Sequence, residues 1–290
     1  MYKYVHKKVK RTRPKNSFSN PTEGPLSKKA IYELFLLSTF IFILSALLVQ
    51  FLMNFQTAIL LRHYSISFTY SLFSINFSSF STAKWTLFRI YIVFGLSSLE
   101  FFIAGIMLLF IKVKNWKVKL ILTWLAFLMI HVLPLGLLSG IFIYDGFGIA
   151  YIWLFQSIMV RILISLTALL ITIFFRQFWI YRFLKTVYSR KYLDNDFYRT
   201  KYIKYCFILP WFAGVIILSA FALPHHTWNW LVFIFGLACV ILPIFKKKVP
   251  FHKILIYKSD KKILPLRYPL IYFITIIGVI WLGSLIKIYF

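Results

Sequence analysis

Four short basic segments divide this chain, and a pair of long apolar runs separates each one from the next. Together the four segments hold 29 of the 34 Lys and Arg residues. The polar segments within each pair of runs carry almost no Lys or Arg. Such alternation of basic and neutral connections is the positive-inside pattern of a multi-pass membrane protein. The basic segments are 1–29, 112–119, 176–204 and 246–267, and the neutral ones are 62–85, 143–147 and 224–227.

The apolar runs are long enough to cross a bilayer as helices, which takes about 20 residues each. Their share of the chain is too large for a soluble fold, because 61% of the residues are hydrophobic and soluble domains hold roughly 45–50%. The sequence therefore predicts an all-α integral membrane protein with seven transmembrane helices. The predicted spans are 30–61, 86–111, 120–143, 147–175, 205–223, 228–245 and 268–287.

The first 29 residues are polar and basic, so we expect a disordered cytoplasmic tail ahead of a membrane domain that covers 30–290. The first apolar run is far longer than the core of a signal peptide, which holds about 7–15 residues, and it should stay attached. With the N-terminus in the cytoplasm, seven spans leave the C-terminus outside. We predict the cytoplasmic (inner) membrane of a bacterium, with an organelle membrane as the alternative.

The formal charge of +27 resembles that of a nucleic-acid-binding protein, but its placement favours another partner. The cations lie in short loops at one membrane face, where each gains about 1 kcal/mol from anionic headgroups. We therefore predict contact with the lipid bilayer and with anionic lipids at the cytoplasmic face, and no binding of nucleic acid. The basic, aromatic segment 176–204 is typical of a helix that lies on this surface, or else docks a partner protein.

The first predicted helix and the segment after it depart from a simple rod and loop. A helix over 30–61 would reach about 48 Å, against about 30 Å for the hydrocarbon core, so it must tilt, break or project. Apolar and polar residues alternate from Tyr64 to Leu72 and then, in the other register, through Phe80. This pattern predicts a short β-hairpin at 64–80 on the outer face, with a Ser/Thr-rich loop as the alternative.

Charged residues in the middle of a membrane are rare and costly, and two of them occur in the predicted spans. Glu100 and Arg161 lie near the middle of the second and fourth predicted helices, and His131 lies near the middle of the third. Equal depth would allow the three side chains to meet in one polar network. Such a network would either order the bundle as a buried ion pair or carry protons or anions.

The third predicted helix also contains Pro134, Gly136 and Gly140. Proline favours a kink, and small residues four apart let another helix approach closely, so we assign these residues to helix packing. Cys206 and Cys239 both lie in apolar runs, where packing rather than a disulfide is expected. We predict no metal site, no cofactor and no catalytic residue.

Some fragments of the sequence resemble the intramembrane site-2 zinc metalloproteases. Gln50 and Asn54 form a polar i,i+4 pair ahead of the outer strand segment, and a later helix opens with Gly95-Leu-Ser-Ser-Leu-Glu100. The following helix reads His131-Val-Leu-Pro134-Leu-Gly-Leu-Leu-Ser139-Gly140. The enzymes carry His-Glu-x-x-His, a membrane-associated β-hairpin, a Gly-Pro-containing helix and then Asn-x-x-Pro-x-x-x-Leu-Asp-Gly. The resemblance covers residues 40–145.

The resemblance implies a relative that has lost catalysis. The two zinc histidines would fall on Gln50 and Asn54, the general base on Phe51, and the aspartate ligand on Ser139. Neither amide is a usual zinc ligand, and Phe cannot move a proton.

Three functions are compatible with these features. The first is a non-catalytic component of a membrane complex, which binds a partner protein in a groove formed by Gln50, Asn54 and Ser139. The second is a transporter or proton-coupled translocator that uses the polar network of the second to fourth helices. The third is an enzyme that acts on lipid-linked substrates, with cytoplasmic Arg and Lys holding phosphate. No acid–base constellation in the sequence supports the third function.

Overall fold

The computed structural model describes residues 28–70, 75–77, 85–141, 147–188, 190–193, 196–222, 278 and 288–289. These residues are mostly helical, and among them five helices are long and apolar enough to cross a membrane. The five are Lys28–His63, Leu87–Phe110, Trp116–Leu138, Ile158–Leu184 and Asp196–Ala220. The predicted span 228–245 lies outside the described residues, as do the predicted span 268–287 apart from residue 278 and the predicted tail up to residue 27.

Helix α1 (Lys28–His63) is one continuous rod of 36 residues, so it does not break within the membrane-length run. It ends in a Schellman motif, which satisfies its last carbonyls. The amide of Ile66 donates to the Leu61 carbonyl at 3.0 Å, and the amide of Ser65 donates to the Arg62 carbonyl at 3.0 Å. Ser65 has a φ of 55°, the left-handed conformation that this motif requires. The motif turns the chain from α1 toward the first strand.

The next two membrane-length helices form an antiparallel pair. The first consists of α2 (Leu87–Ile90), the π-helical turn η1 (Tyr91–Leu96) and α3 (Ser97–Phe110), and the second is α4 (Trp116–Ser139). Each begins at a side-chain cap. The Thr86 hydroxyl accepts from the Arg89 amide at 3.3 Å, and the Asn115 side chain accepts from the Lys117 amide at 3.0 Å.

Two helices, α5 (Phe147–Leu154) and α6 (Ile158–Phe174), replace the single helix that the sequence predicts over 147–175. The Tyr151 hydroxyl donates to the Arg161 carbonyl at 2.7 Å and holds α5 against the start of α6. Hydropathy does not reveal this break, because apolar residues continue on both sides of it. Arg161 consequently lies in the first turns of α6 and not at the middle of a span.

Five short elements follow: α7 (Arg176–Leu184), the 3-10 turn η2 (Arg190–Leu193), α8 (Asp196–Ile203), the π turn η3 (Lys204–Ile208) and α9 (Leu209–Ala222). The predicted surface helix in 176–204 is thus divided, and the aromatic side of α7 packs inward. Trp179 and Phe183 are only 2% and 0% exposed. The aromatic residues of this segment therefore contribute to the core of the bundle as well as to its surface.

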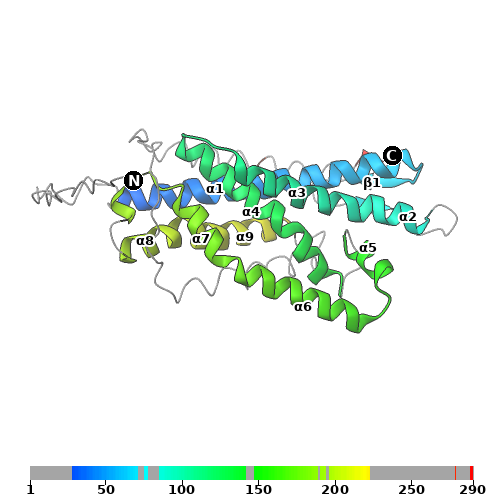
Figure 1. The fold of residues 1–290 in the computed structure, drawn as a ribbon. Helices are drawn as coiled ribbons and strands as arrows, with labels where there is room; N and C mark the ends of the chain where they lie inside the picture. Colours follow the sequence, from blue (N-terminus) through cyan, green and yellow to red (C-terminus); the bar gives the residue numbers. More distant parts are fainter. Residues whose placement is uncertain are drawn as a thin grey trace, which may run out of the picture.

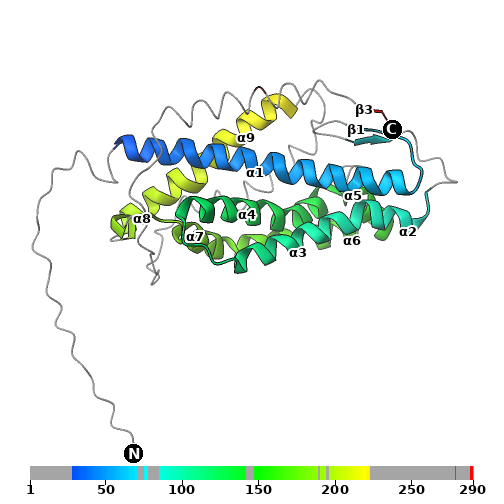
Figure 2. The same cartoon turned by 90° about the horizontal axis from the view of Figure 1, so that it is seen from above.

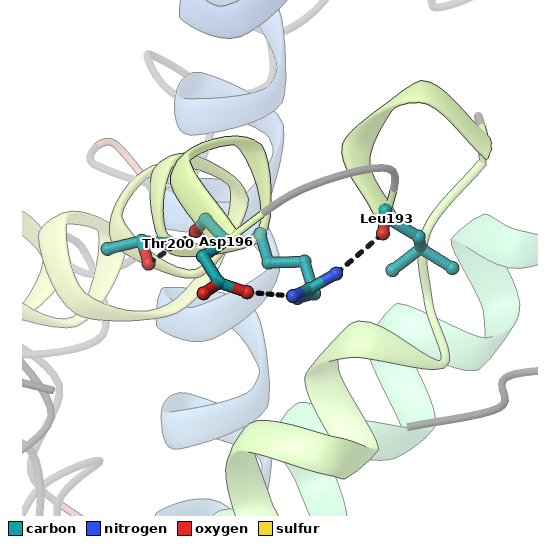
Figure 3. A network of polar contacts seen from close by, with 4 residues as sticks. Leu193, Asp196 and Thr200 are labelled. Atoms are coloured by element: carbon teal, nitrogen blue, oxygen red, sulfur yellow. Dashed lines mark hydrogen bonds and ion pairs between the residues drawn. The ribbon is translucent and has the colours of Figure 1, made fainter. Parts of the chain in front are cut away.

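A buried arginine fastens η2 to α8 (Figure 3). Arg199 forms an ion pair with Asp196 and donates to the Leu193 carbonyl at 2.7 Å. The Thr200 hydroxyl donates to the Asp196 carbonyl at 2.7 Å. Because an unpaired buried charge is costly, the Asp196 carboxylate accounts for the burial of this cation.

The main core is centred on Trp124 of α4, which is fully buried. Its ring lies 4.9 Å from that of Phe42 on α1, 4.8 Å from Phe183 on α7 and 5.4 Å from Phe207 in η3. Four elements that are distant in the sequence therefore meet around one indole. Figure 2 shows α1 lying between α9 on one side and the layer of α3, α4 and α6 on the other.

Three short strands form a sheet in the order β2-β1-β3, namely β1 (Phe68–Tyr70), β2 (Ile75–Phe77) and β3 (Ile288–Tyr289). β1 pairs antiparallel with both neighbours, so that Thr69 lies opposite Asn76 on one side and opposite Tyr289 on the other. Residues 71–74 between β1 and β2 lie outside the described part of the chain, and the hairpin at 64–80 stays a prediction.

The sheet and α5 lie at the end of α1 that is remote from Lys28 (Figure 1). We call this the sheet end of the bundle. The start of α1, the connection 111–115, α7 and α8 lie at the opposite end, which we call the basic end.

Candidate functional site

Glu100 is a carboxylate near the middle of the 24-residue helix Leu87–Phe110. It directly follows the π turn and the first residues of α3, and its side chain is exposed. Gln56 on α1 donates a hydrogen bond from its Nε2 to the Glu100 carboxylate. Within the described residues no Lys, Arg or His forms an ion pair with Glu100. Among the described residues, Glu100 therefore has one hydrogen-bond donor, and that donor is neutral.

A second amide pair lies on the half of α1 toward the sheet end. Gln50 donates from its Nε2 to the Asn54 Oδ1 at 3.1 Å. Residues four apart share one side of a helix, so this bond follows directly from the sequence spacing. Together with Gln56, these residues give this half of α1 three amide side chains.

Exposed apolar side chains flank the Gln56–Glu100 pair on both helices. On α3 they are Leu96, Ile103 and Met107, which share one side of the helix with Glu100 and are 40%, 44% and 65% exposed. On α1 they are Leu52 and Ile59, which are 39% and 53% exposed. We call these five residues, with Gln56 and Glu100, the α1–α3 surface. It is apolar at its rim and polar at its centre.

His131 is part of the core and is 1% exposed. Its Nδ1 lies 2.5 Å from the Phe127 carbonyl, and its ring lies 4.3 Å from that of Phe127 and 5.5 Å from that of Trp179. One ring nitrogen is thus occupied by the backbone of its own helix. The contacts of His131 are those of a packed core histidine.

Arg161 is 8% exposed and lies between α6 and the end of α4. Its Nη1 donates to the Gly140 carbonyl at 3.3 Å, while its Nε is buried and has no hydrogen-bond partner among the described residues. The described contacts therefore place Glu100, His131 and Arg161 in three separate environments. They do not form the single polar network that equal depth suggested.

The end of α4 that carries Ser139 packs on α5 and α6. The Ser165 hydroxyl donates to the Leu137 carbonyl at 2.8 Å, and a Cβ at Gly140 would lie 2.7 Å from the Tyr151 ring. Gly140 is therefore the point of close approach between α4 and α5, and its amide donates to the Gly136 carbonyl at 3.0 Å.

The residues beside Ser139 thus contact α5 and α6, whereas Gln50 and Asn54 lie on α1. The described contacts do not unite the three positions of the predicted groove. The side chain of Ser139 itself lies outside the described structure. Pro134 is accommodated inside α4, which continues to Ser139.

Gln56 is the residue of this site that the sequence did not single out. The sequence did contain a sign of its importance, because Gln56 is a further amide after Gln50 and Asn54 in a helix that is otherwise largely apolar toward the sheet end. What could not be foreseen was that its side chain would reach α3 and not its own helix.

No group of three or more His, Cys, Asp or Glu residues that could hold a metal ion is found in the described part of the chain. Comparison with protein-family models, with curated proteins and with solved structures finds no match. The geometry of the site is therefore the basis for assigning a function.

Proposed function

We propose that this protein is a non-catalytic component of a membrane complex, and that its α1–α3 surface binds a transmembrane helix of a partner protein. The observation that carries the proposal is Glu100, an exposed carboxylate in a membrane-length helix to which the described residues offer a single amide, that of Gln56. Lipid tails can cover Leu96, Ile103 and Met107, but they cannot solvate a carboxylate.

The chemistry of the surface defines the partner. A charged side chain in the centre of a bilayer costs at least ~2.5–3.5 kcal/mol on insertion scales and almost always faces protein or water. A partner helix that brings Lys, Arg, His or an amide to Glu100 would supply the missing donor. Its apolar side chains would pack on the exposed rim. The occupant is therefore an apolar helix with one polar, preferably basic, residue.

The resemblance to the site-2 metalloproteases is part of this proposal. On this resemblance the two zinc histidines would fall on Gln50 and Asn54, and the mutual hydrogen bond of that pair at 3.1 Å supports a structural role for it. In this view the chain keeps the membrane core of a protease and uses it to hold a partner rather than to cleave one.

We further propose that the chain crosses the bacterial inner membrane seven times, with its N-terminal tail in the cytoplasm. The pairing of β3 with β1 supports an odd number of crossings, because it brings residues 288–289 to the sheet end while α1 starts at the basic end. A hairpin at 64–80 and the C-terminal strand would then lie together on the outer face.

Arg161 favours a second candidate function, that of a transporter or proton-coupled translocator. A buried guanidinium whose Nε has no partner in the described part of the chain is a group that an anion or a titrating side chain could engage. Replacing Arg161 by Met should then abolish transport at normal protein abundance. The separation of Arg161 from Glu100 and His131 makes this the weaker candidate.

The proposed function is tested by site-specific photocrosslinking of the full chain in cells of its native host. A photoreactive amino acid replaces Ile103, one turn from Glu100, and in a matched control it replaces Leu163, which is 65% exposed on α6. We expect position 103 to capture one membrane protein and position 163 to capture lipid. Glu100→Ala should abolish the protein adduct.

The captured peptide should come from a transmembrane segment that carries a basic or amide residue. Two results would contradict the proposal. One is lipid adducts alone at both positions. The other is an adduct with the mass of a single chain that joins position 103 to residues 228–287, because the protein would then cover the surface itself.

A further inference from the structure

Three cations from two helices come together at the basic end of the bundle. Lys119 lies in the first turn of α4, Arg182 lies in the last turn of α7, and Lys185 is the C-cap of α7. All three side chains are half-buried. The charged groups that act on Lys119 are the other two cations, Lys185 and Arg182, and both repel it.

Two of the cations are held in place by the protein. Arg182 donates from Nη1 to the Leu109 carbonyl at the end of α3, at 3.0 Å, and its guanidinium lies 5.1 Å from the ring centre of Phe178. The ammonium of Lys185 lies 4.2 Å from the ring centre of Tyr181. These contacts fix where the charges lie without neutralising them.

No counter-charge for this cluster is found among the described residues. Of their carboxylates, Asp196 pairs with Arg199, Glu100 is bound by Gln56, and Glu33 interacts with Lys29. Two phenols in the chain after α7, those of Tyr188 and Tyr192, do not supply a negative charge either. Burial raises the pKa of Tyr188 and of Tyr192, so both stay neutral at physiological pH.

Exposed apolar side chains lie next to the cluster. Phe110, which follows the Leu109 carbonyl that Arg182 binds, is 76% exposed, and Ile111 and Met107 are 52% and 65% exposed. A concentrated positive charge beside an exposed apolar strip matches an amphiphile with an anionic head. A soluble anion would make no use of the apolar strip.

We propose that Lys119, Arg182 and Lys185 bind the phosphate of one anionic phospholipid, whose acyl chains lie along the exposed end of α3. The three cations lie outside the α1–α3 surface, and Met107 is the one residue that the apolar strip shares with it. The lipid supplies a negative charge that the described residues do not provide, and the site ties α3, α4 and α7 to a single lipid molecule at the basic end.

The test is native mass spectrometry of the full-length protein in detergent, titrated with phosphatidylglycerol. The variant Lys119→Gln/Lys185→Gln removes two charges without removing a hydrogen bond that either side chain makes to the described protein. Its matched control, Lys112→Gln/Lys114→Gln, removes two charges from the adjacent connection, where both side chains are exposed.

We expect the first pair to weaken phosphatidylglycerol binding by about fivefold for each cation removed, or about 25-fold together. The control pair should change binding by less than about twofold. Adding Arg182→Gln should weaken binding further, and Arg182→Lys should restore part of it, which separates loss of charge from loss of fold.

Three results would overturn the proposal. Equal losses in the two pairs would mean that the lipid responds only to overall charge. Equal binding of phosphatidylcholine would mean that the cations do not select an anionic lipid. Displacement of phosphatidylglycerol by millimolar inorganic phosphate would identify a site for a soluble anion.

Discussion

The indole nitrogen of Trp124 donates a hydrogen bond to the hydroxyl of Ser38 at 2.9 Å, and this bond joins α4 to α1 inside the core. The same hydroxyl donates to the Cys206 carbonyl at 2.5 Å. That carbonyl lies in η3, and a π turn departs from the regular hydrogen-bond ladder of an α-helix. One serine side chain therefore satisfies polar groups of two other elements.

Replacing Ser38 by Ala should lower the free energy of unfolding by about 1–3 kcal/mol, because it leaves the Trp124 indole and the Cys206 carbonyl without their partner. Unfolding in mixed micelles of increasing SDS content, followed by circular dichroism, measures the change. Thr167→Ala is the control, since that hydroxyl is exposed and bonds only within its own helix, to Leu163. Equal effects of the two variants would show that the buried bonds contribute little.

The close contact between α3 and α4 depends on Gly105, which the sequence pattern did not single out. A Cβ at Gly105 would lie 2.9 Å from the Met129 Cβ and 3.0 Å from the Ile130 backbone nitrogen. Because backbone cannot move aside as a flexible side chain can, Gly105→Ala should destabilise the protein by about 1–3 kcal/mol.

The matched control for this prediction is Gly95→Ala on the same membrane-length helix. The nearest atom to a Cβ at Gly95 is the Ala150 Cβ at 3.7 Å, an ordinary contact. This variant should be neutral or slightly stabilising, since Ala favours a helix by up to about 1 kcal/mol over Gly. The same SDS titration compares the two. A larger loss at Gly95 than at Gly105 would contradict the packing described here.

The positions of the long helices could be predicted from hydropathy alone, because burial in lipid depends on the sum of many apolar side chains. The bounds of α1 and of the α2–α3 helix agree with the predicted 30–61 and 86–111 to within two residues. Hydropathy could not predict the break between α5 and α6. At that break the Tyr151 hydroxyl donates to the Arg161 carbonyl, a contact between residues on either side of it that hydropathy does not encode.

The candidate site was harder to predict, because depth in the membrane does not determine the direction of a side chain. Glu100 and His131 have similar depths in their predicted spans, yet Glu100 is directed to α1 and His131 to the aromatic core. Apolar residues occupy most positions around both helices, so hydropathy alone does not determine how each helix is rotated. The contact of Gln56 with Glu100 could not be predicted either, because the two residues lie 44 positions apart in the sequence.

The left-handed residue at the end of α1 gives a simple test of the Schellman motif. A non-glycine residue with φ near 55° carries a cost of about 1 kcal/mol. Ser65→Gly should therefore raise the free energy of unfolding by up to that amount, whereas Ser65→Val should lower it. If the order of the two variants is reversed in the SDS titration, the side chain of Ser65 contributes more than its backbone conformation.

The opposite ends of the bundle should lie on opposite sides of the membrane. His63 at the sheet end and Lys114 at the basic end are both exposed. In a background with Cys206→Ala and Cys239→Ala, a membrane-impermeant maleimide should label His63→Cys in intact cells and Lys114→Cys only after permeabilisation. Labelling of both positions from one side would exclude the proposed orientation.

The bond between Gln56 and Glu100 should contribute to stability even without a partner protein. Interhelical hydrogen bonds in membranes contribute about 0.6 kcal/mol on average and up to about 1.7 kcal/mol. Gln56→Leu should cost about this much, because it removes the donor and leaves the carboxylate with none in the described structure. Glu100→Gln should cost less, since its side-chain carbonyl still accepts from Gln56.

A double-mutant cycle isolates this interaction from the other effects of each change. If the bond forms, adding Glu100→Gln to Gln56→Leu should cost less than the sum of the two single changes. Leu99→Ala, an exposed neighbour of Glu100 that is 45% accessible, replaces Glu100→Gln in a control cycle and should be additive with Gln56→Leu. Because Glu100→Gln keeps the acceptor, additivity in both cycles would mean that Gln56 does not favour the carboxylate over an amide, and the charge of Glu100 would then depend on the partner helix alone.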